Sequence, residues 1–187
     1  MKSLTALFEQ LKQMLGKPDR LHPAQVDPIV YAVYSPAEAL GLRRQLPGLV
    51  ASLRNDGWHV QTISVADLVW GIVEESGRYG EWLAAESAAE PDQINEAVSD
   101  ALRANNALVG RVAELVAEDQ KGRVVLLTDV ELLHPFFRAR AIESALHDRV
   151  KVPLVVFYPG DRSGQYGLKF LGFYQEDGNY RSPIIGG

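Results

Sequence analysis

The sequence predicts an α/β layered sandwich with a mostly parallel central sheet and with antiparallel strands added at the C-terminal edge. Short apolar runs rich in β-branched and aromatic residues, at 27–34, 123–129 and 152–160, have the length of buried strands. Segments with the apolar spacing of amphipathic helices lie between them, and strand, helix and strand in that order imply parallel pairing. At 187 residues the chain fits one domain, residues 1–187.

The N-terminal third begins with a helix and then alternates strand and helix. Leucines at three-and-four spacing, with Ser3 placed as a cap, predict a helix over 3–15. The run at 27–34 is the first strand, and Ser35 caps the helix that follows it. Because Pro47 lacks the amide donor that a helix interior needs, we expect this helix to kink or break there.

The middle of the chain repeats this order. The segment WHVQTISV is the second strand, and Ser64 caps the helix after it. A new helix begins at Pro91, and its apolar stripe continues to Val116, which predicts one long helix. The run at 123–129 is a central strand, HPFFRARAIESALHD is a short helix, and 152–160 is another central strand.

After Gly160 the pattern changes to strand and turn. The segments GLKFLGFY and QEDGNYRSPII, with a tight turn at residues 177–179, predict a β-hairpin region over 166–185. The glycine-rich stretch YPGDRSGQYGLKFLG leaves one strand and enters another, so no helix N-terminus lies behind it to bind a phosphate. We expect a turn at Pro159 and Gly160 and a strand-to-strand connection.

Composition limits the classes of function. Without cysteine the chain has no disulfide, thiolate zinc site or cysteine nucleophile, which fits a reducing cytoplasmic setting. No run approaches the length of a membrane span, and no signal peptide is apparent. A net charge of −5 disfavours direct nucleic-acid binding, and scattered arginines such as Arg138, Arg140 and Arg149 leave a local basic groove as an alternative.

Catalytic motifs are not apparent, so we predict no catalytic residue, no metal and no cofactor. Asp129 ends an apolar strand, as a magnesium-positioning acid does in phosphate-loop ATPases, but we favour an N-cap made by Thr128 or Asp129. His134 follows nearby and is a candidate neighbour of Asp129. The carboxyl ends of the strands bring Ser35, Asp129 and Tyr158 to one rim, which is a candidate cleft for a small ligand.

The C-terminal half contains three characteristic segments: RVVLLTDVELLHPFFRARAIESAL, VPLVVFYPGDRSGQYGLKFLG and NYR. In these segments the chain resembles the BrxB family of bacteriophage exclusion (BREX) systems. The chain departs from the family pattern at Asn179, where a second tyrosine is expected. The matching positions are Pro135, Phe136, Arg138, Tyr158, Pro159, Gly160, Gly164, Leu168, Gly172, Tyr180 and Arg181.

The resemblance implies a component of an antiphage defence system. The expected partners are its alkaline-phosphatase-like protein, its large ATPase and its methyltransferase. Together with the missing catalytic motifs, this favours a non-catalytic adaptor. A nucleotide- or phosphate-binding enzyme of degenerate phosphate-loop type and a DNA-binding accessory protein remain alternatives. The candidate ligand- or partner-binding residues are Asp129, His134, Arg138, Tyr158, Gly160, Asp161, Arg162, Gln165, Tyr180 and Arg181.

Overall fold

The predicted apolar runs form the centre of a mostly parallel sheet, which confirms the α/β fold. The computed structural model describes residues 3–17, 28–118, 120–146, 148–178 and 180–187. Neighbouring strands follow the order β2-β3-β4-β1-β6, all parallel, and β5 pairs with β4 in the antiparallel sense. The strands are β1 Ile29–Tyr34, β2 His59–Ser64, β3 Arg123–Thr128, β4 Leu154–Ser163, β5 Gly167–Phe170 and β6 Ile184–Gly186.

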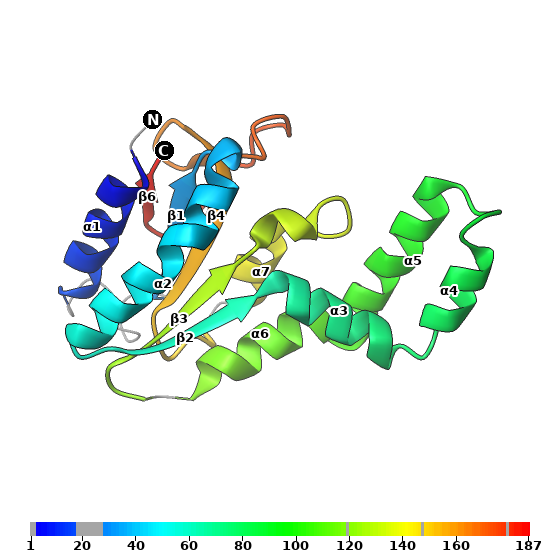
Figure 1. Cartoon of the computed structure of the whole chain (residues 1–187), viewed down its shortest axis with the longest axis horizontal. Helices are drawn as coiled ribbons and strands as arrows, with labels where there is room; N and C mark the ends of the chain where they lie inside the picture. The colour runs from blue at the N-terminus through cyan, green and yellow to red at the C-terminus, as the bar shows by residue number, and fades with distance from the viewer. Residues whose placement is uncertain (1–2, 18–27, 119, 147, 179) are drawn as a thin grey trace.

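Helices cover both faces of this sheet (Figure 1). Successive side chains of a strand point to opposite faces. In β1, Val30, Ala32 and Tyr34 therefore pack with α1 and α2, while Tyr31 and Val33 join the other core beside α6 and α7. The helices are α1 Leu4–Leu15, η2 Pro36–Glu38, α2 Ala39–Asn55, α3 Val65–Glu75, α4 Tyr79–Ala85, α5 Pro91–Arg103, η3 Ala104–Asn106, α6 Ala107–Ala117, η4 Val130–Leu133 and α7 Ala139–Leu146.

The predicted N-caps are confirmed because they depend only on local sequence. The hydroxyl oxygens of Ser3, Ser35 and Ser64 accept from the amides of Ala6, Ala37 and Ala66. Each hydroxyl satisfies one amide that has no partner within its helix. The caps at Ser35 and Ser64 place a helix start directly after β1 and after β2.

Two predictions about helix continuity are tested. Of the kink or break predicted at Pro47, the break does not occur: α2 runs through this residue, since its apolar face at Leu42, Leu49 and Leu53 stays buried on the sheet. The long helix predicted from Pro91 is divided, because Asn105 and Asn106 adopt left-handed backbone with φ of 52° and 57°. Asparagine tolerates that conformation, and the division turns α6 into a new direction relative to α5.

The connection after β4 also differs from the prediction. β4 continues through Pro159 and Gly160 to Ser163, because its last residues pair with β5, so the turn lies at 164–166. α7 begins only at Ala139, later than predicted.

The C-terminal segment joins the sheet in a way that the sequence did not indicate. Asp177 forms an antiparallel bridge with Leu168 of β5. The chain then crosses to the far side of β1, where β6 pairs in parallel with Tyr31, Ala32 and Val33. The predicted turn at 177–179 includes Asn179, which lies outside the described residues.

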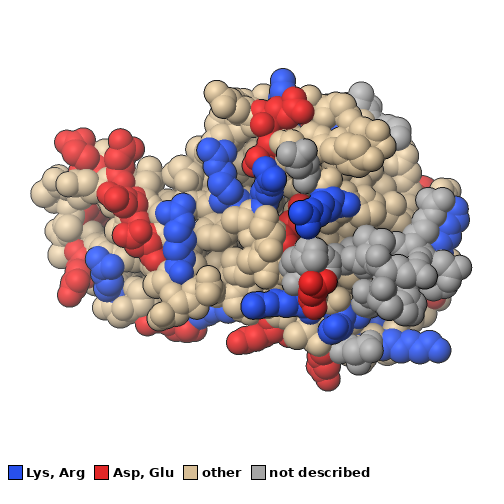
Figure 2. Space-filling view, turned by 180° about the vertical axis from the view of Figure 1, so that it is seen from behind, with Lys and Arg blue, Asp and Glu red and all other residues tan. Residues whose placement is uncertain are grey.

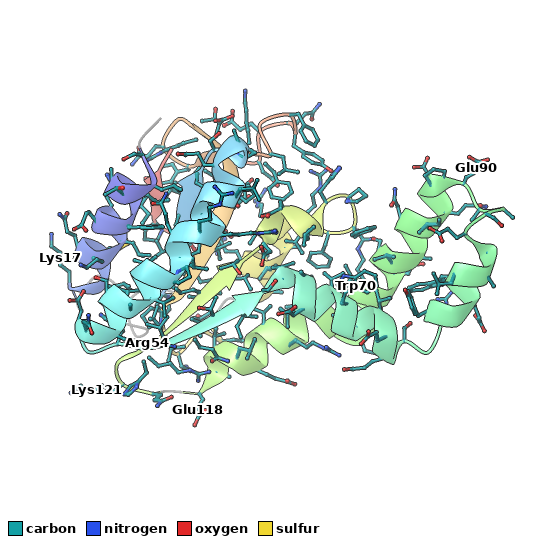
Figure 3. All side chains as sticks on the ribbon, viewed as in Figure 1. Lys17, Arg54, Trp70, Glu90, Glu118 and Lys121 are labelled. Carbon is teal, nitrogen blue, oxygen red and sulfur yellow. The ribbon has the colours of Figure 1, made fainter. Side chains whose placement is uncertain are left out.

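α3, α4 and α5 (residues 65–103) form a helical arm that extends away from the sheet (Figure 1). Figure 3 labels Trp70 toward the base of this arm and Glu90 at its tip. Within the described part of the chain, no helix is long and apolar enough to cross a membrane.

Candidate functional site

Three parallel strands end at the rim of the sheet where open α/β folds bind ligands. Tyr34, Ser64 and Thr128 close β1, β2 and β3, and Asp129 follows β3 directly. A hollow of about 370 Å³ opens between these strand ends and α2. The predicted rim therefore exists as a shallow site, and its side chains decide what it can bind.

Asp129 is the centre of a polar network at this rim. Its backbone is left-handed, and its carboxylate accepts from the Ser64 hydroxyl at 2.6 Å and from Arg43 Nε at 2.9 Å. The Thr128 hydroxyl lies 3.3 Å from the Ile63 carbonyl and 3.2 Å from the same carboxylate, and its single proton is shared between these two acceptors. The predicted cap by Thr128 or Asp129 is wrong, because neither side chain accepts from an amide of η4. The Asp129 oxygens accept hydrogen bonds from the Arg43 guanidinium and from the Ser64 and Thr128 hydroxyls instead.

Glu131 completes the network. Arg43 Nη2 lies 3.3 Å from its carboxylate, and the Tyr34 hydroxyl donates to it at 3.2 Å. Burial, and then the charge of Glu131, raises the pKa of the Tyr34 hydroxyl far above its ordinary value, so it remains a donor. Asp129 and Glu131 share one guanidinium. An incoming phosphate therefore meets net negative charge in this hollow.

The rim lacks a recognisable catalytic pair. The Ser64 hydroxyl already caps α3 and donates to Asp129, and His134 bonds to the hydroxyl of Tyr174 rather than to Asp129. Among the described residues, no three His, Asp or Glu side chains gather closely enough to hold a metal ion. The network joins α2, the end of β3 and the start of α3, which fixes the base of the arm.

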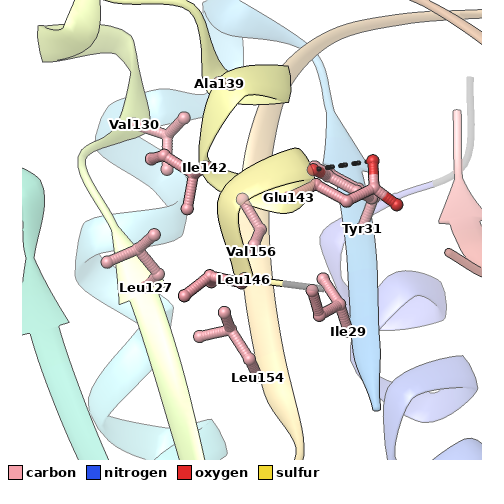
Figure 4. A pocket seen from close by; sticks show the side chains of 10 residues that line it. All are labelled: Ile29, Tyr31, Leu127, Val130, Ala139, Ile142, Glu143, Leu146, Leu154 and Val156. Atoms are coloured by element: carbon pink, nitrogen blue, oxygen red, sulfur yellow. Dashed lines mark hydrogen bonds between the residues drawn. The ribbon is translucent and has the colours of Figure 1, made fainter. Parts of the chain in front are cut away.

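Two candidate binding residues, Tyr158 and Tyr180, lie inside the core at 1% and 2% exposure. With Tyr31 they form edge-to-face rings whose centroids are 4.9 to 6.2 Å apart. Burial raises the pKa of Tyr158 to about 12. The Tyr31 hydroxyl donates to Glu143 (Figure 4), which also accepts from the amide and hydroxyl of Ser182. The cluster fixes the C-terminal segment to the sheet.

The end of β4 and the turn after it present a different set of candidates. Asp161, Arg162 and Gln165 are exposed, whereas Gly160 is buried in the ladder between β4 and β5. Arg162 Nε donates to the Gly164 carbonyl at 3.1 Å and its Nη2 donates to the Gln165 carbonyl at 3.3 Å. The Arg162 side chain at the end of β4 therefore holds the turn, and Asp161 is exposed next to it in sequence.

A small aromatic patch contains two further candidates. The His134 ring nitrogen bonds to the Tyr174 hydroxyl, and the Arg138 guanidinium lies over the Tyr174 ring at 4.5 Å. Phe173 stacks on Tyr174 with ring centroids 4.8 Å apart and is itself 67% exposed. Arg181 is also exposed. The structure thus brings His134 and Arg138 together on one tyrosine.

A larger apolar hollow lies on the helical arm. This arm groove has a volume of about 430 Å³, and four of its lining residues are large hydrophobic side chains that are 39 to 55% exposed: Trp70, Tyr79, Leu83 and Leu132. The Trp82 indole Nε1 is buried with no hydrogen-bond partner in the described structure. The remaining lining residues are Ala66, Val69, Val73, Glu86, Ile94, Val98 and Phe136.

Reasoning from sequence missed the arm groove. The sequence predicts a helical stripe at Leu68, Val69, Ile72 and Val73; the last three are buried on α3, and Leu68 is partly buried. Trp70 lies off that stripe, and its ring meets Tyr79 edge to face at 6.0 Å. One sequence feature could have indicated this groove. A glycine-interrupted segment contains three aromatic residues within thirteen positions: Trp70, Tyr79 and Trp82.

The chain was compared with protein families, curated proteins and solved structures. The model of a family described as BREX protein BrxB matches residues 61–185, which is two thirds of the chain. The matched part begins in β2 and ends in β6, so it includes the helical arm, the rim after β3 and the turn after β4. No significant match was found among the curated proteins or the solved structures.

Proposed function

Because the chain belongs to the BrxB family of BREX proteins, we propose that it acts as a non-catalytic adaptor that binds another protein of its BREX system through the arm groove. Family membership makes it a component of a BREX antiphage system. The adaptor role and the surface that performs it are our proposal.

The exposed apolar lining of the arm groove is the observation that supports this role most strongly. Trp70, Leu83 and Leu132 are 55%, 51% and 41% exposed, and they come from three different elements that converge on one hollow. Large apolar side chains gathered at one place on a soluble surface mark binding sites for proteins or ligands, whereas single exposed ones need no explanation. Aromatic residues are also the ones that dominate binding energy at protein interfaces.

The chemistry of the rim favours the adaptor over a nucleotide-binding enzyme. A phosphate site needs free donors, whereas Arg43 at the rim is already shared between Asp129 and Glu131. The turn at 164–166 leads into β5, so it is not the loop before a helix that a site of phosphate-loop type requires. A net charge of −5 also disfavours binding to a phosphate backbone.

The proposal is tested by affinity purification of the tagged full chain from cells that carry the complete defence island. We expect the wild type to capture the alkaline-phosphatase-like protein, the large ATPase or the methyltransferase, identified by mass spectrometry. The double variant Trp70→Ser with Leu83→Ser removes exposed apolar area from the arm groove and should reduce capture at least about tenfold.

Leu40→Ser is the matched control, because Leu40 is 66% exposed on α2, outside the arm groove. This variant should capture the same partner as the wild type. A chain that purifies alone from these cells, or equal capture by the groove and control variants, would contradict the proposal. Circular dichroism of each variant verifies that the fold is retained.

A further inference from the structure

The walls of the arm groove determine which kind of backbone fits it. α3, α4, α5 and η4 supply all of its lining except Glu86 and Phe136, so most backbone groups around it are used in helical turns. An extended segment placed there would bury its own amides and carbonyls without partners. A helix carries its backbone hydrogen bonds with it and presents only side chains. The groove therefore suits an amphipathic helix rather than an added strand.

The net charge of the arm indicates which charge a helix bound in the groove should carry. Residues 74–103 contain eight acidic and two basic side chains, a net of −6, although the whole chain carries only −5. Glu86 lines the arm groove itself. Among the described residues, Glu75 is the one acid of this segment that forms an ion pair, with Arg111. Glu90 caps α5 with its side chain, and the remaining carboxylates of the segment form no ion pair in the described structure.

The distribution of charge also argues against a second copy docking by its own arm. On the face seen in Figure 2, acidic side chains gather over the arm and basic side chains lie mostly over the body of the molecule. Two such arms would repel each other, whereas a basic ligand is attracted and steered toward the groove.

We infer that the arm groove binds an amphipathic helix of the partner protein, with lysine or arginine residues flanking its apolar stripe. This inference rests on the proposed function, because it names what the adaptor recognises. Apolar side chains spaced at i, i+3 or i+4 and i+7 enter the groove beside Trp70 and Leu83. The flanking basic side chains meet Glu86 and the other acids of the arm.

The first test identifies the bound segment directly. Tyr79 lines the groove and is 39% exposed, so it is replaced by the photo-crosslinker p-benzoylphenylalanine in the full chain. The captured complex is irradiated, and the crosslinked segment is identified by mass spectrometry. We expect a segment with helical apolar spacing and net positive charge. A crosslink to an acidic segment, to an extended one or to a second copy of this chain overturns the inference.

The second test measures the charge contribution. Glu86→Lys should weaken capture of the partner about three- to tenfold at 50 mM salt, and the difference should disappear near 0.5 M salt. Glu9→Lys is the matched control, since Glu9 is an exposed acid on α1, outside the arm. Equal effects of the two reversals, or no effect of Glu86→Lys, also overturn the inference.

The two proposals fail in different ways. Absence of any captured BREX component refutes the adaptor role and this inference together. Two other outcomes refute the basic helix and leave the adaptor role standing. In the first, capture depends on Trp70 and Leu83 but not on Glu86. In the second, position 79 crosslinks to a non-helical segment.

Discussion

Replacing Gly160 by alanine tests how closely the end of β4 packs on β5. Gly160 pairs with Phe170 in the antiparallel ladder. A Cβ added at Gly160 would come within 2.1 Å of the Lys169 carbonyl oxygen and within 3.0 Å of the Tyr158 ring. Both neighbours are fixed, the first by backbone pairing and the second by its place in the tyrosine cluster.

The size of the effect follows from these distances. Carbon and carbonyl oxygen approach to about 3.3 Å, so the Lys169 backbone must move by about 1 Å. Overpacking of this kind costs about 1–3 kcal/mol, and because backbone rather than a side chain must yield, we expect about 3 kcal/mol for Gly160→Ala. With a urea m-value of about 2 kcal/mol/M, the unfolding midpoint falls by about 1.5 M.

Urea unfolding followed by the fluorescence of the three tryptophans measures this change. Gly164→Ala is the control, because Gly164 has a positive φ of 63° but no atom within 4 Å of an added Cβ. It should cost only about 1 kcal/mol, through backbone strain alone. Arg162→Glu removes two exposed hydrogen bonds to the turn and should cost about 1 kcal/mol, well below the effect of Gly160→Ala. A Gly160→Ala variant as stable as Gly164→Ala would refute the packing argument.

Three other predictions concern the core and the helix break. Burial raises the pKa of Tyr158 to about 12 from an ordinary 10, so the free energy of unfolding should be highest below pH 10 and should fall as pH rises toward 12. Urea midpoints measured across this range should fall less steeply in Tyr158→Phe. Glu143→Ala removes the acceptor of the Ser182 amide and should cost about 2 kcal/mol, with faster proteolysis of the C-terminal segment than in Glu143→Gln. Asn106→Val should lower the melting temperature, whereas Asn106→Gly should not, since φ there is 57°; equal melting temperatures would contradict this.

Much of the fold could be predicted because its determinants are local. The apolar run that became β1 and the serine caps at Ser35 and Ser64 each depend on a few adjacent residues. The errors arose where tertiary contacts outweigh local preference. Pro47 stays helical because α2 is held on the sheet, and β6 pairs with β1 across more than 150 residues of sequence.

The site was harder to predict than the fold, for the same reason. The rule for parallel sheets placed Asp129 at the rim. It gave no indication that Arg43, which comes from a helix 86 residues earlier, would occupy its carboxylate. The arm groove depends on which helix face remains unpacked, and a periodic stripe shows only the face that is buried. Trp70 became informative once the position of α4 was known.

The contrast between rim and arm explains why binding is assigned to the arm. At the rim, Asp129 and Glu131 are bonded to groups of the same chain, so a ligand would have to displace Arg43 and Tyr34 before gaining any contact. In the arm, by contrast, apolar side chains are exposed, and among the described residues that line the groove no hydrogen-bond network has to be displaced. α4 has only seven residues, too few to be stable alone, and packs there with the Trp82 indole Nε1 unsatisfied.

A partner that covers the arm groove therefore gains apolar area without breaking an existing hydrogen-bond network. The exposed faces of Trp70 and Leu83 lose water when they are covered, and α4 is held between its own chain and the partner. Binding that favours the folded arm stabilises it by mass action. In the proposed complex the Asp129 network fixes the base of the arm to the sheet, and the sheet would be the rigid support that positions the arm.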